Sequence, residues 1–124
     1  MNEVKKNLKP NNDKLYWDIW TDACELATEK AIEHQPKMIK WVDGEGNTYE
    51  HDLCGFARVV LSDGRSSFAK WAKKNVGFDG GYYGVQKSVD AFGQSYERKE
   101  VFAQVVASEL NKNGINAWCQ SNLD

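Results

Sequence analysis

The sequence predicts an α+β protein in which a sheet of about four strands carries three helices, packed mainly on one face. Three observations predict it. The 124 residues suffice for one domain with its own core. Apolar residues recur at helical spacing in three segments and alternate in four others, in the order α-β-β-α-β-α-β. This order has too few strand–helix alternations for a doubly wound sheet, so we expect a two-layer sandwich, with a three-layer α/β arrangement as the alternative.

The chain begins with a polar segment that has no hydrophobic period. Residues 1–12 contain Pro10 and two consecutive Asn, and we expect them to form a flexible tail before a single domain over 13–124. A helix is predicted over about 14–34, because Leu15, Ile19 and Ala23 share one face with Leu26 and Ala27. Pro36 ends it.

Two strands are predicted next, over 38–42 and 48–61, joined by the Gly-containing turn 43–47. Both faces of the second strand are largely apolar, which is typical of a central position in a sheet. The side chains on one face are Leu53, Gly55, Ala57, Val59 and Leu61. Asp63-Gly64 ends this strand with a turn.

The rest of the chain predicts two helices and two strands. Ser66 or Ser67 caps a short helix that ends before Gly77. A Gly-rich lead then precedes a half-exposed strand over 84–92. Ser95 caps the last helix, which Asn113-Gly114 closes, and a short strand over 115–121 follows.

Charge, cysteine content and hydropathy exclude several classes of protein. A net charge of −2 argues against non-specific nucleic-acid binding, which depends on excess Lys and Arg. Three widely spaced cysteines do not form a secreted disulfide scaffold, so we expect a reducing compartment, the cytoplasm. No apolar run is long enough for a signal peptide or a membrane span, and no membrane partner is predicted.

The strongest candidate surface is basic. Lys70, Lys73 and Lys74 lie at i, i+3 and i+4 of the middle helix, and Arg65 precedes them. Such a face could bind phosphates or an acidic protein surface. The alternative is a solvated polar face whose lysines complement the helix dipole. Tyr82, beside a Gly pair, is a further candidate contact residue.

An acidic ridge runs along the first helix. Asp18, Asp22, Glu25 and Glu29 lie at i, i+4, i+7 and i+11, where like charges repel by a few tenths of a kcal/mol per pair. The ridge could mimic nucleic acid, dock on a basic partner, or meet this chain's own basic helix in an oligomer. A solvated helix face is the alternative reading.

The sequence offers no catalytic pair and no cofactor motif. On a strand, His51 and Asp52 point to opposite faces, and Cys54 does not share a face with His51. The cysteines and histidines lack the CxxC or HxxxH spacing of a zinc site. We therefore predict no catalytic residues, no metal and no cofactor.

Four segments resemble small uncharacterised proteins encoded by tailed bacteriophages: CGFARV (54–59), SSFAKWAKKN (66–75), GQSYERKEVFAQVVASELNKNGINA (93–117) and QSNLD (120–124). The resemblance covers about residues 53–124 and brings no activity and no site residues. It implies a phage protein that acts in the host cytoplasm or is packed in the virion.

The predicted function is a non-enzymatic, phage-encoded accessory or host-interaction protein. It would contact a host or phage protein through the 65–74 helix and Tyr82. A minor virion structural component, which would require self-association or a docking site on capsid or tail, is the alternative. A small enzyme is the third possibility.

Overall fold

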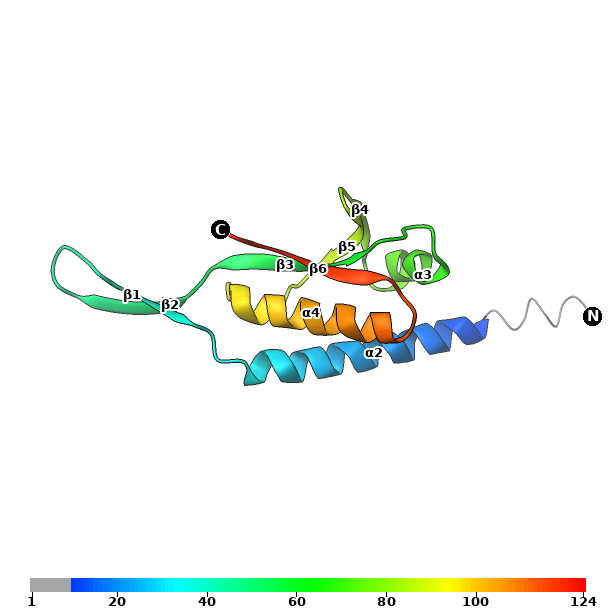
Figure 1. The fold of residues 1–124 in the computed structure, drawn as a ribbon, viewed down its shortest axis with the longest axis horizontal. Coiled ribbons are helices and arrows are strands. Elements are labelled where there is room, and N and C mark those ends of the chain that lie inside the picture. The colour runs from blue at the N-terminus through cyan, green and yellow to red at the C-terminus, as the bar shows by residue number, and fades with distance from the viewer. Residues whose placement is uncertain (1–9) are drawn as a thin grey trace, which may run out of the picture.

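The computed structural model describes residues 10–124 and has the predicted α+β class. Its helices and strands form one elongated body, from which a narrow projection extends at one end (Figure 1). In chain order they are α2 (Pro10–Glu33), β1 (Met38–Val42), β2 (Thr48–Asp52), β3 (Gly55–Leu61), α3 (Ser67–Asn75), β4 (Asp79–Gly81), β5 (Gly84–Ser88), α4 (Tyr96–Lys112) and β6 (Ala117–Leu123).

The predicted element order needs correction, because the chain has two more strands than expected. The order is α-β-β-β-α-β-β-α-β. The predicted strand over 48–61 divides at Leu53–Cys54, where the backbone pairs with Ser95 and Tyr96 instead of continuing one ladder. The Gly-rich lead contains β4, which pairs with β5 through a tight turn at Tyr82–Tyr83.

The first helix begins earlier than predicted. It starts at Pro10, so residues 10–12 of the expected tail are helical; the rest of that tail lies outside the described residues. Proline is compatible with a first helical turn, because the N–H it lacks has no partner there. The sequence pattern missed this turn because residues 10–12 carry no apolar period.

A four-stranded antiparallel sheet, ordered β4-β5-β3-β6, forms the body. The predicted central position of the apolar strand is confirmed, since β3 pairs with β5 on one side and β6 on the other. Ala57, Val59 and Leu61 belong to the main core. The alternate residues Phe56 and Arg58 point to the opposite face.

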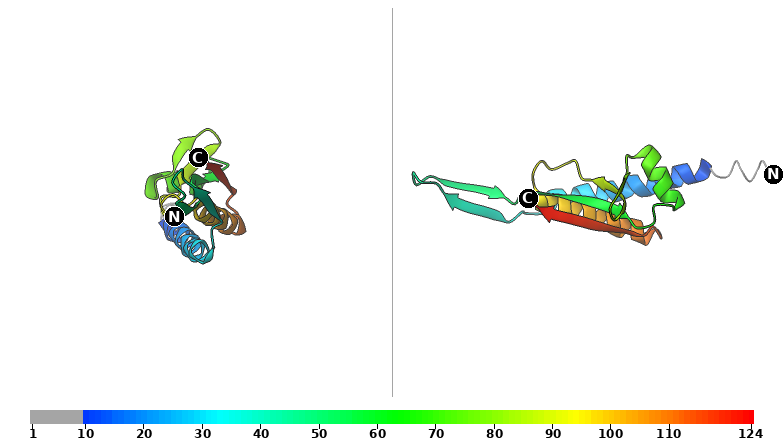
Figure 2. Two further views of the ribbon diagram at one scale, coloured as in Figure 1. Left: turned by 90° about the vertical axis from the view of Figure 1, so that its left-hand side faces the viewer. Right: turned by 90° about the horizontal axis from the view of Figure 1, so that it is seen from above.

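Helices α2 and α4 lie on the same side of this sheet (Figures 1 and 2). α4 packs under β3 and β6, and α2 runs along α4. Alanines at i, i+4 and i+8 of α2 (Ala23, Ala27 and Ala31) are fully buried, as is Ala103 of α4. Small side chains allow two helix backbones to approach closely. Larger side chains fill the space nearer the sheet: Phe68, Phe78, Val106 and Leu110.

Both predicted serine caps are confirmed. Ser66 Oγ accepts a hydrogen bond from Ala69 N at 3.1 Å, and Ser95 Oγ accepts one from Arg98 N at 3.4 Å. Each satisfies one of the donors that a helix leaves free at its first turn. Gly114 follows α4 with φ +79°, a left-handed conformation that ends many helices.

Gly55 lies at the start of β3, close to both β6 and the first residue of α4, and it tests this packing. A Cβ there would lie 2.5 Å from Asn122 O and 2.6 Å from Tyr96 Cδ1. We expect Gly55→Ala to lower the free energy of unfolding by about 1–3 kcal/mol through overpacking, measured by denaturant titration. Gly44→Ala is the control, since that Cβ would meet nothing within 4 Å. Equal effects of the two substitutions would contradict the packing described.

Candidate functional site

The narrow projection is a hairpin of β1 and β2, here called the arm (residues 38–52) (Figure 1). Its strands pair antiparallel from Met38↔Asp52 to Val42↔Thr48 and form a sheet separate from that of the body. Every residue of the two strands is exposed except the half-buried Asp52. A lone two-stranded hairpin is marginally stable in water, so its other contacts matter.

Apolar side chains occupy both faces of the arm. Trp41 stacks on Tyr49, with ring centroids 4.4 Å apart and planes inclined by 22°, and Ile39 extends that face by alternation. The other face carries Met38 and Val42. The exposed fractions are 47% for Trp41, 49% for Met38 and 63% for Val42. None of these side chains belongs to the core formed within residues 10–124.

Asp43 organises the turn of the arm. Its carboxylate accepts hydrogen bonds from Glu45 N at 2.9 Å, Asn47 N at 2.9 Å, Asn47 Nδ2 at 3.2 Å and Tyr49 Oη at 3.0 Å. These donors, the backbone N–H of Asn47 first, lower the pKa of the Asp43 carboxyl. The turn therefore also positions one ring of the aromatic stack, through Tyr49.

The start of α4 holds the entry to the arm. Glu97 Oε1 lies 2.8 Å from His34 Nε2, just after α2, and its Oε2 accepts from Lys37 N at 2.9 Å, one residue before β1. The hydrogen bond with His34, followed by that from Lys37 N, lowers the pKa of Glu97. Arg98 donates to His34 O from the same turn at 3.4 Å.

The same helix start holds the exit from the arm. Tyr96 N donates to Leu53 O at 2.9 Å, and Gly55 N donates to Gln94 O at 3.3 Å. Cys54 forms an isolated bridge with Ser95. Both ends of the arm are thus fixed to residues 94–97, a set we call the arm clamp. An otherwise marginal hairpin is thereby anchored to the body.

The predicted basic face lies at the far end of the molecule from the arm (Figures 1 and 2). Lys70, Lys73, Lys74 and Arg65 are all exposed, and none forms a salt bridge among residues 10–124. The opposite side of α3 is buried on α2 through Phe68 and Trp71. Trp71 Nε1 also donates to Asp13 at 2.8 Å.

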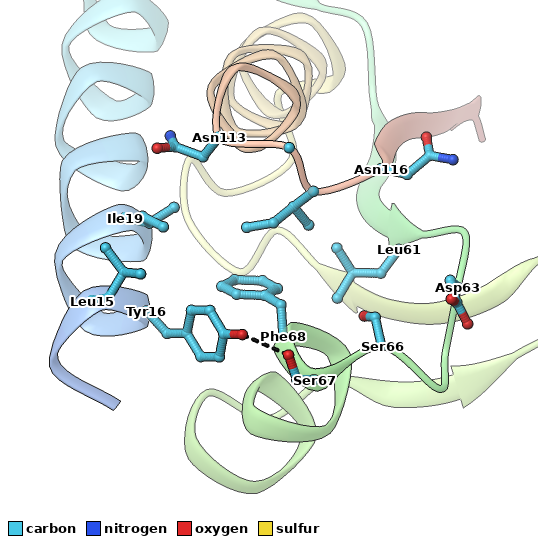
Figure 3. Close-up of a pocket in the computed structure, with 12 residues that line it drawn as sticks. Leu15, Tyr16, Ile19, Leu61, Asp63, Ser66, Ser67, Phe68, Asn113 and Asn116 are labelled. Atoms are coloured by element: carbon cyan, nitrogen blue, oxygen red, sulfur yellow. Dashed lines mark hydrogen bonds between the residues drawn. The ribbon is translucent and has the colours of Figure 1, made fainter. Parts of the chain in front are cut away.

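A pocket of about 340 Å³ lies beside α3, between α2 and the end of α4 (Figure 3). Its walls mix apolar side chains, including Leu15, Ile19 and Phe68, with hydroxyl and amide groups. Tyr16 Oη and Ser67 Oγ form a hydrogen bond of 2.6 Å across one wall (Figure 3). Asp63 is the lone carboxylate of the lining.

Tyr82 is 89% exposed. Its aromatic contact is with Tyr83, not with a side chain of α3. Its ring packs on Tyr83, which packs on Trp118 of β6 at 5.7 Å. Trp118 is paired with Val60 in the sheet, on the face that α2 and α4 leave open. The joint surface of the 65–74 helix and Tyr82 stays a prediction.

The acidic ridge is an exposed face of α2. Asp18 accepts from Lys14 Nζ at 2.9 Å, a pair that the sequence reasoning did not count. Asp22, Glu25 and Glu29 are exposed and form no salt bridge within the described chain. An exposed i,i+4 pair contributes only about 0.3–0.5 kcal/mol. Whether the ridge docks on a partner stays a prediction.

Cys54 is exposed, whereas Cys24 and Cys119 are partly buried. Burial raises the pKa of Cys24 to about 11 and that of Cys119 to about 11, so both thiols are protonated at neutral pH. His51 Nδ1 lies 2.8 Å from the backbone oxygen of Asp52, its chain neighbour. Among residues 10–124 no three His, Cys, Asp or Glu are placed to hold a metal ion.

No helix within residues 10–124 combines the length and apolar character needed to cross a membrane. Comparison with protein-family models, with curated proteins and with solved structures finds no match. The candidate site is therefore assigned from geometry alone.

The arm was not predicted as a separate unit. Its strands were predicted, but as part of the main sheet. One signal was present: Met38 and Val42 share a strand face with the charged Lys40, which is not typical of a strand face that covers a core.

Asp43→Ala tests the turn. We expect the arm to lose its order, because four hydrogen bonds converge on this carboxylate, and the nuclear Overhauser contacts between the Trp41 and Tyr49 rings to weaken. The global unfolding midpoint should stay unchanged, since the arm lies outside the core. Glu45→Ala, next to Asp43 in the same turn, should keep the ring contacts. Retention of those contacts in Asp43→Ala would refute this role.

Glu97→Gln tests the arm clamp. Because the folded-state pKa of Glu97 lies below its ordinary value, its stabilisation is present above roughly pH 4.3 and is lost as the pH falls through the folded-state pKa. We expect a loss of about 1 kcal/mol at pH 7, measured by denaturant titration, which disappears in acid.

The exposed Glu29→Gln on α2 is the matched control for Glu97→Gln and should be neutral at both pH values. A Glu97→Gln deficit that is the same at pH 7 and at pH 3 would show that the carboxylate charge is not what matters.

Proposed function

We propose that this chain is a non-enzymatic protein-binding protein that acts through its arm. The observation that carries the proposal is the projection of a clamped hairpin whose apolar side chains remain exposed on both faces. Exposed apolar patches on a folded protein are typical of interaction sites. Trp and Tyr, here Trp41 and Tyr49, are the residues most enriched among binding hot spots.

The architecture of the arm supports binding in two further ways. Both outer strand edges of the hairpin leave backbone donors and acceptors free, which permits a partner strand to add. The arm clamp fixes the direction in which the arm projects, which lowers the ordering cost on binding. A phage origin, a host partner and a place in the virion stay predictions.

An affinity-capture experiment tests the proposal. The native chain is immobilised through a tag and exposed to a lysate of bacterial cells that also produce an untagged copy of the same chain. The bound proteins are identified by mass spectrometry. The paired substitution Trp41→Ser with Tyr49→Ser removes the stack. We expect it to reduce each captured protein at least about tenfold, the loss of one hot spot worth 1.4 kcal/mol or more.

Tyr82→Ser is the control, because it removes an aromatic side chain that is 89% exposed and lies outside the arm. It should capture as the native chain does. The proposal fails if the native chain captures nothing, or if Tyr82→Ser loses the captured proteins while the stack variant keeps them.

A further inference from the structure

The charges of the arm and of the α3 region are opposite. The arm carries one lysine, Lys40, against four carboxylates: Asp43, Glu45, Glu50 and Asp52. Residues 64–78 carry four basic side chains and no acidic one. Glu50 pairs with Lys40 at 3.3 Å, which leaves the other three carboxylates as the excess charge of the arm.

These two regions cannot meet within one chain. The arm extends from one end of the long axis, and α3 lies toward the other end, with α4 and the sheet between them (Figures 1 and 2). The arm clamp fixes the arm so that it points away from the body. Contact between the arm and α3 therefore requires two copies.

The α3 end also presents apolar surface. Leu15 is exposed at the rim of the 340 Å³ pocket. One side of the Trp17 ring packs on Trp71, and 39% of this residue is exposed. A space of this volume is within the range of small binding pockets and can hold an aromatic side chain. Two nearby carboxylates are engaged locally: Asp63 accepts from Arg65 N, and Asp13 from Trp71 Nε1.

We infer that the partner of the arm is a second copy of this chain, whose α3 end receives it in a head-to-tail contact. The inference rests on the proposed function of the arm and names its partner. The acidic side chains of the arm face Lys70, Lys73 and Lys74, and its apolar side chains cover Leu15 at the pocket. Because the two surfaces differ, the contact repeats from copy to copy and forms a ring or a linear polymer.

Sedimentation velocity on the full chain tests the inference. At about 0.1 mM protein, a concentration at which weak contacts are populated, the native chain should sediment at twice the 14.1 kDa monomer mass or more. Association should weaken between about 0.01 M and 1 M salt, as the Debye length falls from roughly 30 to 3 Å. Trp41→Ser should also reduce it, without any change of charge.

A charge exchange separates this contact from general attraction. Reversal of the α3 lysines (K70E, K73E and K74E) should give a monomer, and so should reversal of the arm (Glu45→Lys with Asp52→Lys). An equimolar mixture of the two variants should associate again, because each arm then meets an α3 region of opposite charge.

The matched control is Asp22→Lys with Glu25→Lys on the acidic ridge, which changes the net charge by the same amount as reversal of the arm. It should associate as the native chain does. A monomeric native chain, a mixture that stays monomeric, or a monomeric ridge variant overturns the inference. If capture depends on the arm but the native chain is monomeric, the proposed function stands and only the second copy is excluded.

Discussion

The hydrogen bonds that the first turn of α4 makes with both ends of the arm are the constraint on which the rest of the structure depends. Glu97 accepts a hydrogen bond from the backbone N–H of Lys37, just before β1, and the backbone N–H of Tyr96 donates to the carbonyl of Leu53, just after β2. Without them the segment between α2 and β3 would be a long surface connection. With them, a hairpin of marginal intrinsic stability becomes a directed extension of the body.

Local sequence signals predicted the elements whose boundaries are local in origin. Ser66 and Ser95 mark helix starts because each caps a backbone N–H three residues ahead. The central place of β3 followed from apolar residues on both faces. The break at Leu53–Cys54 could not be predicted this way, because residues about forty positions later cause it.

The same distinction applies to the candidate surfaces. The basic face of α3 was predictable, since the cap and the helical period place three lysines away from Phe68 and Trp71. The grouping of Tyr82 with Trp118 was not, since it depends on the β3–β6 register and the β4–β5 turn. The aromatic content of 12% thus serves three places: the core, the arm and the open face of the sheet.

The two ends of this elongated molecule differ in shape and charge: the arm is thin and acidic, and the α3 end is broad and carries the exposed lysines. Placed in an electric field or beside a charged surface, the molecule carries a dipole moment along its own axis, although its net charge is only −2. A charged surface attracts one end of such a molecule and repels the other before contact. The end that arrives first is therefore selected by the sign of the surface it approaches.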